Sequence, residues 1–450
     1  MTTVANRYLE GNYAPVSDEV TVSSLPVTGS LPESLSGRYL RNGPNPLGTP
    51  EPSAYHWFTG TGMVHGIRIR EGHAEWYRNR FVRSAEVAAA LGEPVHPGPV
   101  HADMDFGPNT NVIGHAGRTF ATVEAGPRPY ELTYELDTIG PCDFGGTLPG
   151  GYTAHPKRDP TSGELHAMSY FWGWGNKVQY TVIDTGGMVR KVVDVDVGGP
   201  VSVHDMSLTE RFAVIYDLPV VFDMDMATSG ATFPYRWEPD YQARIGLLER
   251  DGGADNVSWF EVEPCYVFHP MNAYDDGDQV VLDVVRHPRS FDTQLLGPDE
   301  GPPTLDRWTV DLVAGKVMEE RIDDLGQEFP RVDERVVGHR HRYGYVGAFL
   351  EREDALVKHD LDRRTKEVRP LRSGGGASEA VFVPAEVDAA EDDGWVLSLV
   401  YDADRDASDL LVLNAADFTG EPQAVVHLPQ RVPFGFHGNW VPDDPWSVGP

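Results

Sequence analysis

The amino-acid sequence predicts an all-β protein and, within that class, a seven-bladed β-propeller. One hairpin pattern recurs along the chain: a strand, an aspartate, a glycine or polar turn, and a second strand. Between its copies lie apolar runs rich in β-branched residues, whereas helical periodicity is almost absent. A buried strand followed by a more polar hairpin is what each blade of a propeller requires.

The length of the chain agrees with this architecture. Its 450 residues allow about 64 residues for each of seven blades, enough for four strands with long loops. A double β-sandwich is the alternative, but it needs a linker, and no Ser/Gly/Pro-rich or low-complexity segment is long enough to serve as one. We therefore expect a polar N-terminal arm over residues 1–36 and a single propeller domain over residues 37–450.

The first elements of the domain follow from their turn residues. The Gly, Asn and Pro residues of 37–46 predict turns with a short strand between them. Residues 63–70 and 73–81 are expected to form two strands about a Glu71–Gly72 turn, and therefore a hairpin. Residues 85–91 are the one helix-like stretch in this part of the chain.

The recurring hairpins and the buried runs cover the rest of the domain. The hairpins are expected at residues 134–140, 180–197, 308–322, 357–368 and 411–428. The apolar runs expected to form inner, buried strands are residues 212–216, 280–285, 343–349 and 395–401.

Charge and composition exclude several classes of protein. The chain has 37 Lys and Arg against 69 Asp and Glu, a formal charge of -32, which repels phosphate backbones and anionic membrane surfaces. No uncharged apolar run approaches the length of about 18 residues that a membrane span requires. Cys142 and Cys265 show no C-x-x-C spacing. We expect a soluble, cytoplasmic protein with two reduced thiols and no nucleic-acid partner.

Four of the sixteen histidines stand beside small or apolar residues at the expected ends of inner strands: His155, His204, His269 and His437. Proline after His155 favours an extended backbone, which would hold that ring rigidly. The spacings of 49, 65 and 168 residues exclude a local metal-binding loop but suit strands that converge on a propeller axis. Spacing alone leaves open whether the four bind a metal or are buried core histidines.

Most of the other histidines lie in charged or turn-rich segments, where a surface or structural role is expected. They are His73, His96, His101, His115, His166, His287, His339, His341, His359 and His427.

Eight segments, taken in order, resemble the carotenoid cleavage oxygenase family from about Gly37 to Val441. They are GRYLRNGPNP, HWFTGTGMVHGIRIR, NTNVIGHAGRTFATVEAG, TAHPKRDPTSGELH, HDMSLTERFAVIYDLPVVF, EFPRVD, EAVFVP and GFHGNWV. The resemblance implies a seven-bladed propeller oxygenase domain with one ferrous ion on its axis and long loops capping the face that carries the iron. It also implies that His155, His204, His269 and His437 are the iron ligands.

The resemblance further implies that Glu124, Glu328 and Glu379 surround these ligands. Neutral imidazoles leave the +2 charge of the metal uncompensated, and a carboxylate that accepts the far ring N–H fixes each tautomer and raises ligand basicity. Glu124 follows an apolar strand, where a charge needs a partner. The alternative for each glutamate is an ordinary place on the surface.

The reaction implied is oxidative cleavage of an alkene. Four ligands on an octahedral ion leave two open positions, where dioxygen can bind beside a substrate, so that a C=C bond is cut to give two carbonyl products without an organic cofactor. Protein groups then chiefly shape the pocket. The residues expected to line it are Thr110, which matches a family position near the open iron site, and Val123, Phe171, Phe268 and Phe436.

The identity of the alkene depends on Val123. In stilbene-cleaving members of the family, the residue before the glutamate that corresponds to Glu124 is a lysine. This lysine binds the phenol of the substrate. Valine at that position favours a carotenoid or apocarotenoid, and the rest of the chain is similar to bacterial members that act on such substrates. A stilbene or phenylpropene remains the alternative, and a non-catalytic, metal-stabilised binding module is a further one.

Such an apolar substrate partitions into membranes, so a local apolar patch that touches the bilayer, or a carrier, is needed. Residues 218–235 are the candidate for a transient membrane contact, because their methionines, phenylalanines and few charges differ from the sequence around them. An ordinary buried strand and loop is the equal alternative.

Overall fold

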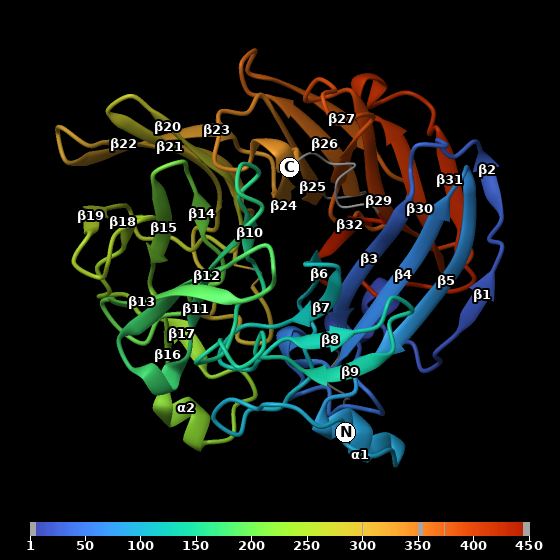
Figure 1. Cartoon of the computed structure of the whole chain (residues 1–450), viewed down its shortest axis with the longest axis horizontal. Helices are drawn as coiled ribbons and strands as arrows, with labels where there is room; N and C mark the ends of the chain where they lie inside the picture. Colours follow the sequence, from blue (N-terminus) through green and yellow to red (C-terminus); the bar gives the residue numbers. More distant parts are fainter. Residues whose placement is uncertain (1–5, 299, 350–353, 373, 444–450) are drawn as a thin grey trace.

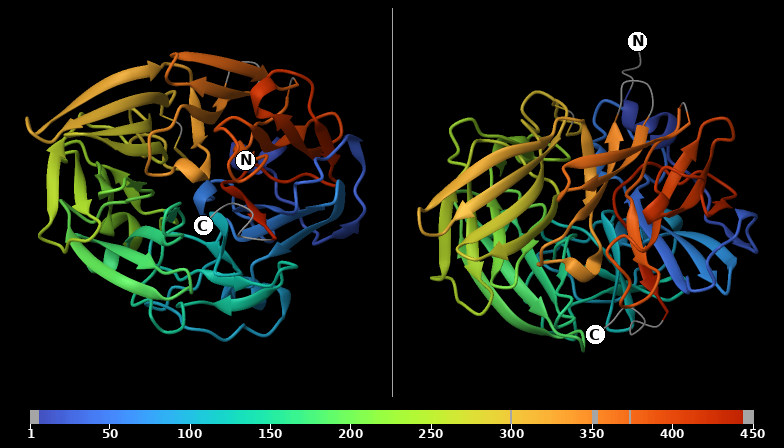
Figure 2. Two further views of the ribbon diagram at one scale, coloured as in Figure 1. Left: turned by 45° about the horizontal axis from the view of Figure 1, so that its top comes forward. Right: turned by 90° about the horizontal axis from the view of Figure 1, so that it is seen from above.

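Seven antiparallel sheets stand in a ring around a central axis, and a separate two-stranded sheet lies outside them (Figure 1). The computed structural model describes residues 6–298, 300–349, 354–372 and 374–443. Tilted views show the same ring, with the blades following one another in sequence order (Figure 2). The prediction of an all-β, seven-bladed propeller is therefore confirmed.

The first blade contains strands from both ends of the chain, and the second to fourth blades are formed by residues 111–261. In each blade the strands are named from the axis outward. The first blade contains β32 (Gly438–Pro442), β3 (Gly37–Pro44), β4 (Gly62–Arg70), β5 (His73–Phe81) and β1 (Thr21–Ser23). The second contains β6 (Asn111–His115), β7 (Arg118–Thr122), β8 (Tyr130–Leu132) and β9 (Thr138–Pro141). The third contains β10 (Lys157–Arg158), β11 (Leu165–Tyr170), β12 (Lys177–Ile183) and β13 (Val189–Asp196). The fourth contains β14 (Ser207–Leu208), β15 (Phe212–Asp217), β18 (Arg244–Glu249) and β19 (Val257–Glu261).

The last three blades continue around the ring. The fifth contains β20 (Pro270–Asp276), β21 (Gln279–Arg286), β22 (Thr304–Asp311) and β23 (Lys316–Asp323). The sixth contains β24 (Gln327–Arg331), β25 (Tyr343–Phe349), β26 (Asp354–Asp360) and β27 (Thr365–Pro370). The seventh contains β28 (Val381–Pro384), β29 (Gly394–Asp402), β30 (Ala407–Asn414), β31 (Ala424–His427) and β2 (Val27–Gly29).

Few elements lie outside the blades. The two-stranded sheet joins β16 (Val220–Phe222) to β17 (Tyr235–Trp237). In the described part of the chain the α-helices are α1 (Ala85–Leu91), as predicted, and α2 (Met224–Thr228). The 3₁₀ turns are Arg7–Leu9, Gly11–Tyr13, Trp57–Thr59, Trp172–Trp174, Glu334–Val336 and Ala415–Asp417. Among the described residues no helix is long and apolar enough to span a membrane.

The ring is closed by strands from both ends of the chain. The C-terminal strand β32 pairs with β3 and is the innermost strand of the first blade, next to the N-terminal strands. In return, β2 pairs with β31 and is the outermost strand of the seventh blade. Residues 1–36, expected as an arm, thus contribute β1 and β2 to two different blades.

Burial explains which strands are continuously apolar. The second strand of a blade packs between neighbouring blades on both faces, so β15 and β21 are buried along almost their whole length. Outer strands face solvent on one side, and β13 alternates buried and exposed positions. The four runs expected as inner strands are the second strands β15, β21, β25 and β29, because in each of these four blades a shorter strand lies nearer the axis.

The predicted hairpins are confirmed in most places. Residues Glu71 and Gly72 join β4 to β5 with φ of 50° and 72°, as a two-residue turn between twisted strands requires. The hairpins expected at 180–197, 308–322, 357–368 and 411–428 are β12–β13, β22–β23, β26–β27 and β30–β31. The hairpin expected at 134–140 was placed too late, because its strands are β8 and β9 and residues 133–137 connect them.

Candidate metal centre

One residue from every blade reaches the axis at the centre. Each of the four predicted histidines stands one to three residues before an innermost strand: His155 before β10, His204 before β14, His269 before β20 and His437 before β32. They therefore come from the third, fourth, fifth and first blades. The three predicted glutamates come from the remaining blades: Glu124 follows β7, Glu328 lies in β24 and Glu379 precedes β28.

The four imidazoles point their Nε2 atoms at one another. The Nε2 atoms of His155 and His204 are 3.0 Å apart, those of His204 and His269 are 3.1 Å apart, and those of His269 and His437 are 3.1 Å apart. All four side chains are buried, and their candidate ligand atoms lie within 4.8 Å of one another. The sequence motifs thus converge on one cluster that could hold a metal ion.

The spacing of this cluster fits a metal with right angles between its ligands. A metal–nitrogen distance of about 2.1 Å separates neighbouring ligand atoms by about 3.0 Å at right angles and by about 3.4 Å in a tetrahedron. The observed 3.0 and 3.1 Å match the first value. Imidazole donors suit iron among several transition metals, so the residues present fit a ferrous ion.

Two of the glutamates are deeply buried, and each has a carboxylate oxygen in contact with Nδ1 of a cluster histidine. Oε2 of Glu328 is 2.6 Å from Nδ1 of His269. Oε1 of Glu379 is 3.0 Å from Nδ1 of His437, and its Oε2 accepts a hydrogen bond of 2.8 Å from the backbone N–H of Gly438. Both contacts leave Nε2 of the histidine without its proton and free to bind a metal.

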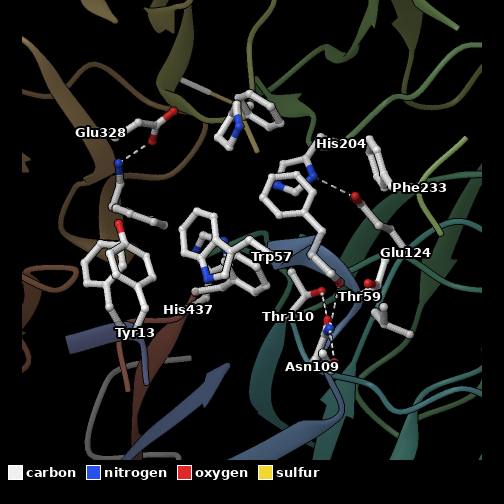
Figure 3. A pocket seen from close by; sticks show the side chains of 18 of the residues that line it. Tyr13, Trp57, Thr59, Asn109, Thr110, Glu124, His204, Phe233, Glu328 and His437 are labelled. Atoms are coloured by element: carbon white, nitrogen blue, oxygen red, sulfur yellow. Dashed lines mark hydrogen bonds and ion pairs between the residues drawn. The ribbon is translucent and has the colours of Figure 1, made fainter. Parts of the chain in front are cut away.

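The third glutamate approaches its histidine with less favourable geometry. Oε2 of Glu124 is 2.7 Å from Nδ1 of His204, but the ring N–H is not aligned with the oxygen, so the contact is an ion-pair distance without a formed hydrogen bond. Figure 3 shows the two side chains facing each other on the side of the pocket near Phe233. The side chain of Glu124 is 13% exposed, compared with 8% for Glu328 and 3% for Glu379.

The electrostatics keep most of the cluster ready to bind a cation. Burial lowers the pKa of His437 to about 3 and, together with its histidine neighbours, holds the pKa of His155 well below its usual value. Burial alone would also lower the pKa of His269, but the negative charge of Glu328 outweighs it and raises that pKa. Burial opposes ionisation of Glu328, yet the neighbouring His269 leaves the carboxyl pKa well below its ordinary range.

A cavity of about 970 Å³ lies against the cluster, and three of the four histidines, all but His155, line it. Its wall is rich in aromatic rings: Trp57, Phe58, Tyr170, Phe233, Tyr235, Phe268, Phe329, Phe434 and Phe436. The size is at the upper end of the range for small-molecule sites, and the predominantly apolar wall is typical of them. The cavity therefore suits a large, apolar ligand beside the metal.

The residues predicted to shape the pocket are mostly found in its wall. Thr110, Val123, Phe268 and Phe436 line the cavity, and the hydroxyl of Thr110 donates a hydrogen bond of 2.9 Å to Asn109 (Figure 3). Phe171 is not part of the lining. Its ring packs against His101 and Trp174 instead, while the neighbouring Trp172 reaches the cavity.

Two residues at the centre were not found from the sequence. His287 was assigned a structural or surface role, but its Nε2 is 2.8 Å from Oε1 of Glu328 and its ring lines the cavity. A usable signal existed, since His287 ends an apolar strand and precedes a proline, as do His155 and His269 in their segments. Arg331, whose Nη1 is 3.2 Å from Oε2 of Glu379, had no such signal.

Comparison with known proteins places this geometry in a family. The family model described as retinal pigment epithelial membrane protein (RPE65) matches residues 13–442. The chain is 48% identical to the carotenoid cleavage oxygenase of Mycobacterium tuberculosis, covering 97% of this chain and 98% of that protein. It is 31% identical to the carotenoid 9,10(9',10')-cleavage dioxygenase of Crocus sativus, covering 97% of this chain and 89% of that protein.

A solved structure agrees over the same length. The lignostilbene dioxygenase of Pseudomonas brassicacearum superposes with a TM-score of 0.87 at 27% identity, covering 97% of this chain and 98% of that one. Fold and site together define an oxygenase built on a β-propeller. The chain belongs to the carotenoid cleavage oxygenase family, as the sequence motifs predicted. A non-catalytic, metal-stabilised binding module is not consistent with this membership.

Proposed function

We propose that this protein is a non-heme, Fe(II)-dependent dioxygenase that cleaves a C=C double bond of a carotenoid or apocarotenoid. One molecule of O₂ supplies both oxygen atoms: the C=C bond is broken, and each of its carbons leaves as a carbonyl group of one product. One iron per chain would be held by His155, His204, His269 and His437. The observation that carries the proposal is the convergence of these four Nε2 atoms beside a large aromatic cavity.

Bound ferrous iron would activate dioxygen. The residues of the chain orient the metal ligands and hold the substrate. The carboxylates of Glu328 and Glu379 keep the rings of His269 and His437 oriented with Nε2 toward the axis. The aromatic wall excludes water and holds an extended apolar substrate by burial of its surface. The reaction needs no general acid or base from the protein, so the wall determines which double bond lies beside the metal.

Cleavage of a stilbene or phenylpropene-type alkene is the alternative function. One solved relative is named as a lignostilbene dioxygenase. The observation that favours the carotenoid is Val123, which lines the cavity beside Glu124 and is almost fully buried, so the wall presents a methyl surface where a phenol-binding cation would stand.

We further propose that substrate enters from a membrane surface through an apolar mouth of the cavity. Phe106 and Trp172 line the cavity and are 39% and 41% exposed. The ring of Trp172 stacks on Phe222 of β16, with centroids 5.2 Å apart. Two residues later α2 begins with Met224, which is 54% exposed. The segment singled out in the sequence thus adjoins an opening, where its exposed side chains could touch a bilayer.

The cellular location proposed is the cytoplasm, consistent with Cys142 and Cys265, which are both free and buried. Fractionation of the native host, with the protein recovered from membrane-free cytosol or loosely bound membranes, tests this location.

Metal content and products test the main proposal. Anaerobically purified protein should contain about one iron per chain, and incubation with a carotenoid or apocarotenoid under O₂ should give two carbonyl products, each labelled from ¹⁸O₂. Single alanine variants of the four histidines should lose iron and turnover, whereas His427→Ala, which changes an outer-strand histidine bonded to Asp409, should keep both. Variants that fold and retain full iron and activity would remove the corresponding ligand from the proposal.

A further inference from the structure

The carboxylate of Glu328 is held from both sides by two histidines of the neighbouring blade. Oε2 lies 2.6 Å from Nδ1 of His269, and Oε1 lies 2.8 Å from Nε2 of His287. Both histidines belong to the fifth blade, one just before β20 and one just after β21, whereas Glu328 lies in β24 of the sixth blade. The carboxylate therefore connects an imidazole of the metal cluster with a second imidazole in the cavity wall.

The direction of both hydrogen bonds follows from the charge of Glu328. The carboxylate lies between two imidazoles, and the backbone N–H of Phe329 also donates to it. An ionised carboxylate has no hydrogen to donate, so it accepts each of these hydrogen bonds. Nδ1 of His269 and Nε2 of His287 must therefore both carry hydrogen.

The ring of His287 is a fixed donor. Its backbone forms an antiparallel bridge with Tyr266, through hydrogen bonds of 2.8 and 2.9 Å, and Pro288 restrains the residue on the other side. The residue is 5% exposed, and the ring of Phe268 packs edge-on against its imidazole at 4.9 Å between centroids. The imidazole has little freedom to turn away from Glu328.

Glu379 shows the same arrangement with a different donor. Its Oε1 contacts the cluster histidine His437, while its Oε2 is fixed by the N–H of Gly438 at 2.8 Å and by Nη1 of Arg331 at 3.2 Å. Each deeply buried glutamate thus has one oxygen on a cluster histidine and the other on a separate donor. Without that donor the carboxylate could rotate, and the cluster histidine would lose its orientation.

We propose that His287 is a positioning residue of the metal centre, which fixes the carboxylate of Glu328 and, through it, the ring of His269. The proposal rests on the proposed function in one respect, since it takes His269 to be a metal ligand. Its consequence is that His287 acts on metal affinity and on the ligand field of the metal.

Two substitutions separate the donor from the ring. His287→Phe keeps a planar ring of similar size but removes the Nε2–H, whereas His287→Gln keeps an N–H donor at a similar reach. Fe(II) affinity, measured anaerobically by competition with a chromophoric chelator, should fall about tenfold or more in His287→Phe and stay within about threefold of wild type in His287→Gln. Visible ligand-field bands of the Co(II)-substituted protein should shift in His287→Phe but not in His287→Gln.

His115→Phe is the matched control. His115 is also a buried histidine, 4% exposed, but its Nε2 is 2.7 Å from the backbone oxygen of Asp184, so its loss should lower thermal stability without changing Fe(II) affinity or the Co(II) bands. Thermal melts identify variants that fold. Unchanged Fe(II) affinity and unchanged Co(II) bands in folded His287→Phe, or equal losses in His287→Phe and His287→Gln, would overturn the positioning role. Absence of specific metal binding in the wild type would instead overturn the proposed function.

Discussion

Nδ1 of His155 lies 3.8 Å from Oδ2 of Asp205, too far for a hydrogen bond, although the other cluster histidines have carboxylate oxygens within 3.0 Å. Asp205 is occupied elsewhere, because its Oδ2 accepts from Nζ of Lys157 at 2.8 Å and its Oδ1 from the backbone N–H of Met206. His155 is held by its backbone instead: its N–H contacts Oγ1 of Thr153 at 3.2 Å, and a proline follows it. The cluster is therefore asymmetric, with one histidine oriented without a carboxylate.

This asymmetry predicts unequal effects of removing carboxylate charge. Glu328→Gln and Glu379→Gln should each weaken Fe(II) binding by about 10- to 100-fold, because each loses the acceptor that fixes a ligand ring. Glu124→Gln should also weaken binding, with a smaller effect because its contact with His204 is not aligned. The measurement is anaerobic Fe(II) competition on folded variants.

Asp205→Asn is the matched control for these variants. It also removes a buried carboxylate near the cluster, but one outside hydrogen-bond range of its histidine. Its Fe(II) affinity should stay within about threefold of wild type. If Asp205→Asn weakens binding as much as Glu328→Gln does, general loss of negative charge, rather than ring orientation, governs affinity.

A second prediction concerns acid stability. Burial lowers the pKa of His65 to about 3, and Nδ1 of its ring is 2.8 Å from the hydroxyl of Tyr77. The folded state therefore keeps His65 neutral, while the unfolded chain protonates it below a pKa of about 6.5. The stability that this residue contributes is complete above pH 6.5 and is lost as the pH falls toward 3, with a slope of up to about 1.4 kcal/mol per pH unit.

Urea unfolding of wild type and His65→Gln at several pH values between 6.5 and 4.5 measures this slope. The variant should be less stable at pH 6.5 but should lose stability more slowly on acidification, because one proton fewer is taken up on unfolding. The exposed His73 offers a control, since His73→Gln should leave the slope unchanged. Parallel curves for wild type and His65→Gln would contradict the assignment.

The propeller was predictable because its signals are local and repeat. Each blade needs a turn such as Glu71–Gly72 and a buried second strand such as Val280–Val285, and both are visible in short windows of sequence. The short innermost strands were missed, because β10 and β14 have only two residues each and carry no period of their own. Their place is set by neighbouring blades rather than by propensity.

The site was only partly predictable for a related reason. The four histidines could be grouped because each stands beside small or apolar residues within a family motif, and the structure brings those four together. His287 lies in the same blade as His269, but its role depends on a carboxylate of another blade, which one strand of sequence cannot show. Phe171 was misplaced because aromatic character indicates burial without indicating which side of a loop the ring faces.

A third prediction tests the substrate through Val123. Val123→Lys places a cation in the cavity wall beside Glu124. In this variant kcat/KM should rise for a hydroxystilbene and fall for an apocarotenoid. A buried ammonium needs a polar partner, which the phenol of the hydroxystilbene supplies and a hydrocarbon chain does not. Val123→Met adds similar bulk without charge and should lower both. Equal behaviour of the two variants would show that volume at this position, and not charge, selects the alkene.

The last prediction concerns entry of the substrate. On α2, Met224 is 54% exposed and Met226 is partly buried. The helix follows Phe222, which lines the cavity and stacks on Trp172 at the mouth of the cavity. If this surface touches the bilayer, Met224→Ser with Met226→Ser should raise the apparent KM for a carotenoid embedded in vesicles, because the mouth then loses apolar area that holds it at the membrane. The same double variant should leave unchanged the KM for a short, water-soluble apocarotenoid, which reaches the mouth from solution.

Met318→Ser, which changes an even more exposed methionine (63%) on the outer strand β23, should alter neither value. A rise in KM for both substrates would place α2 in the binding cavity rather than at a membrane entrance, and no change for either would leave the entrance elsewhere on the molecule.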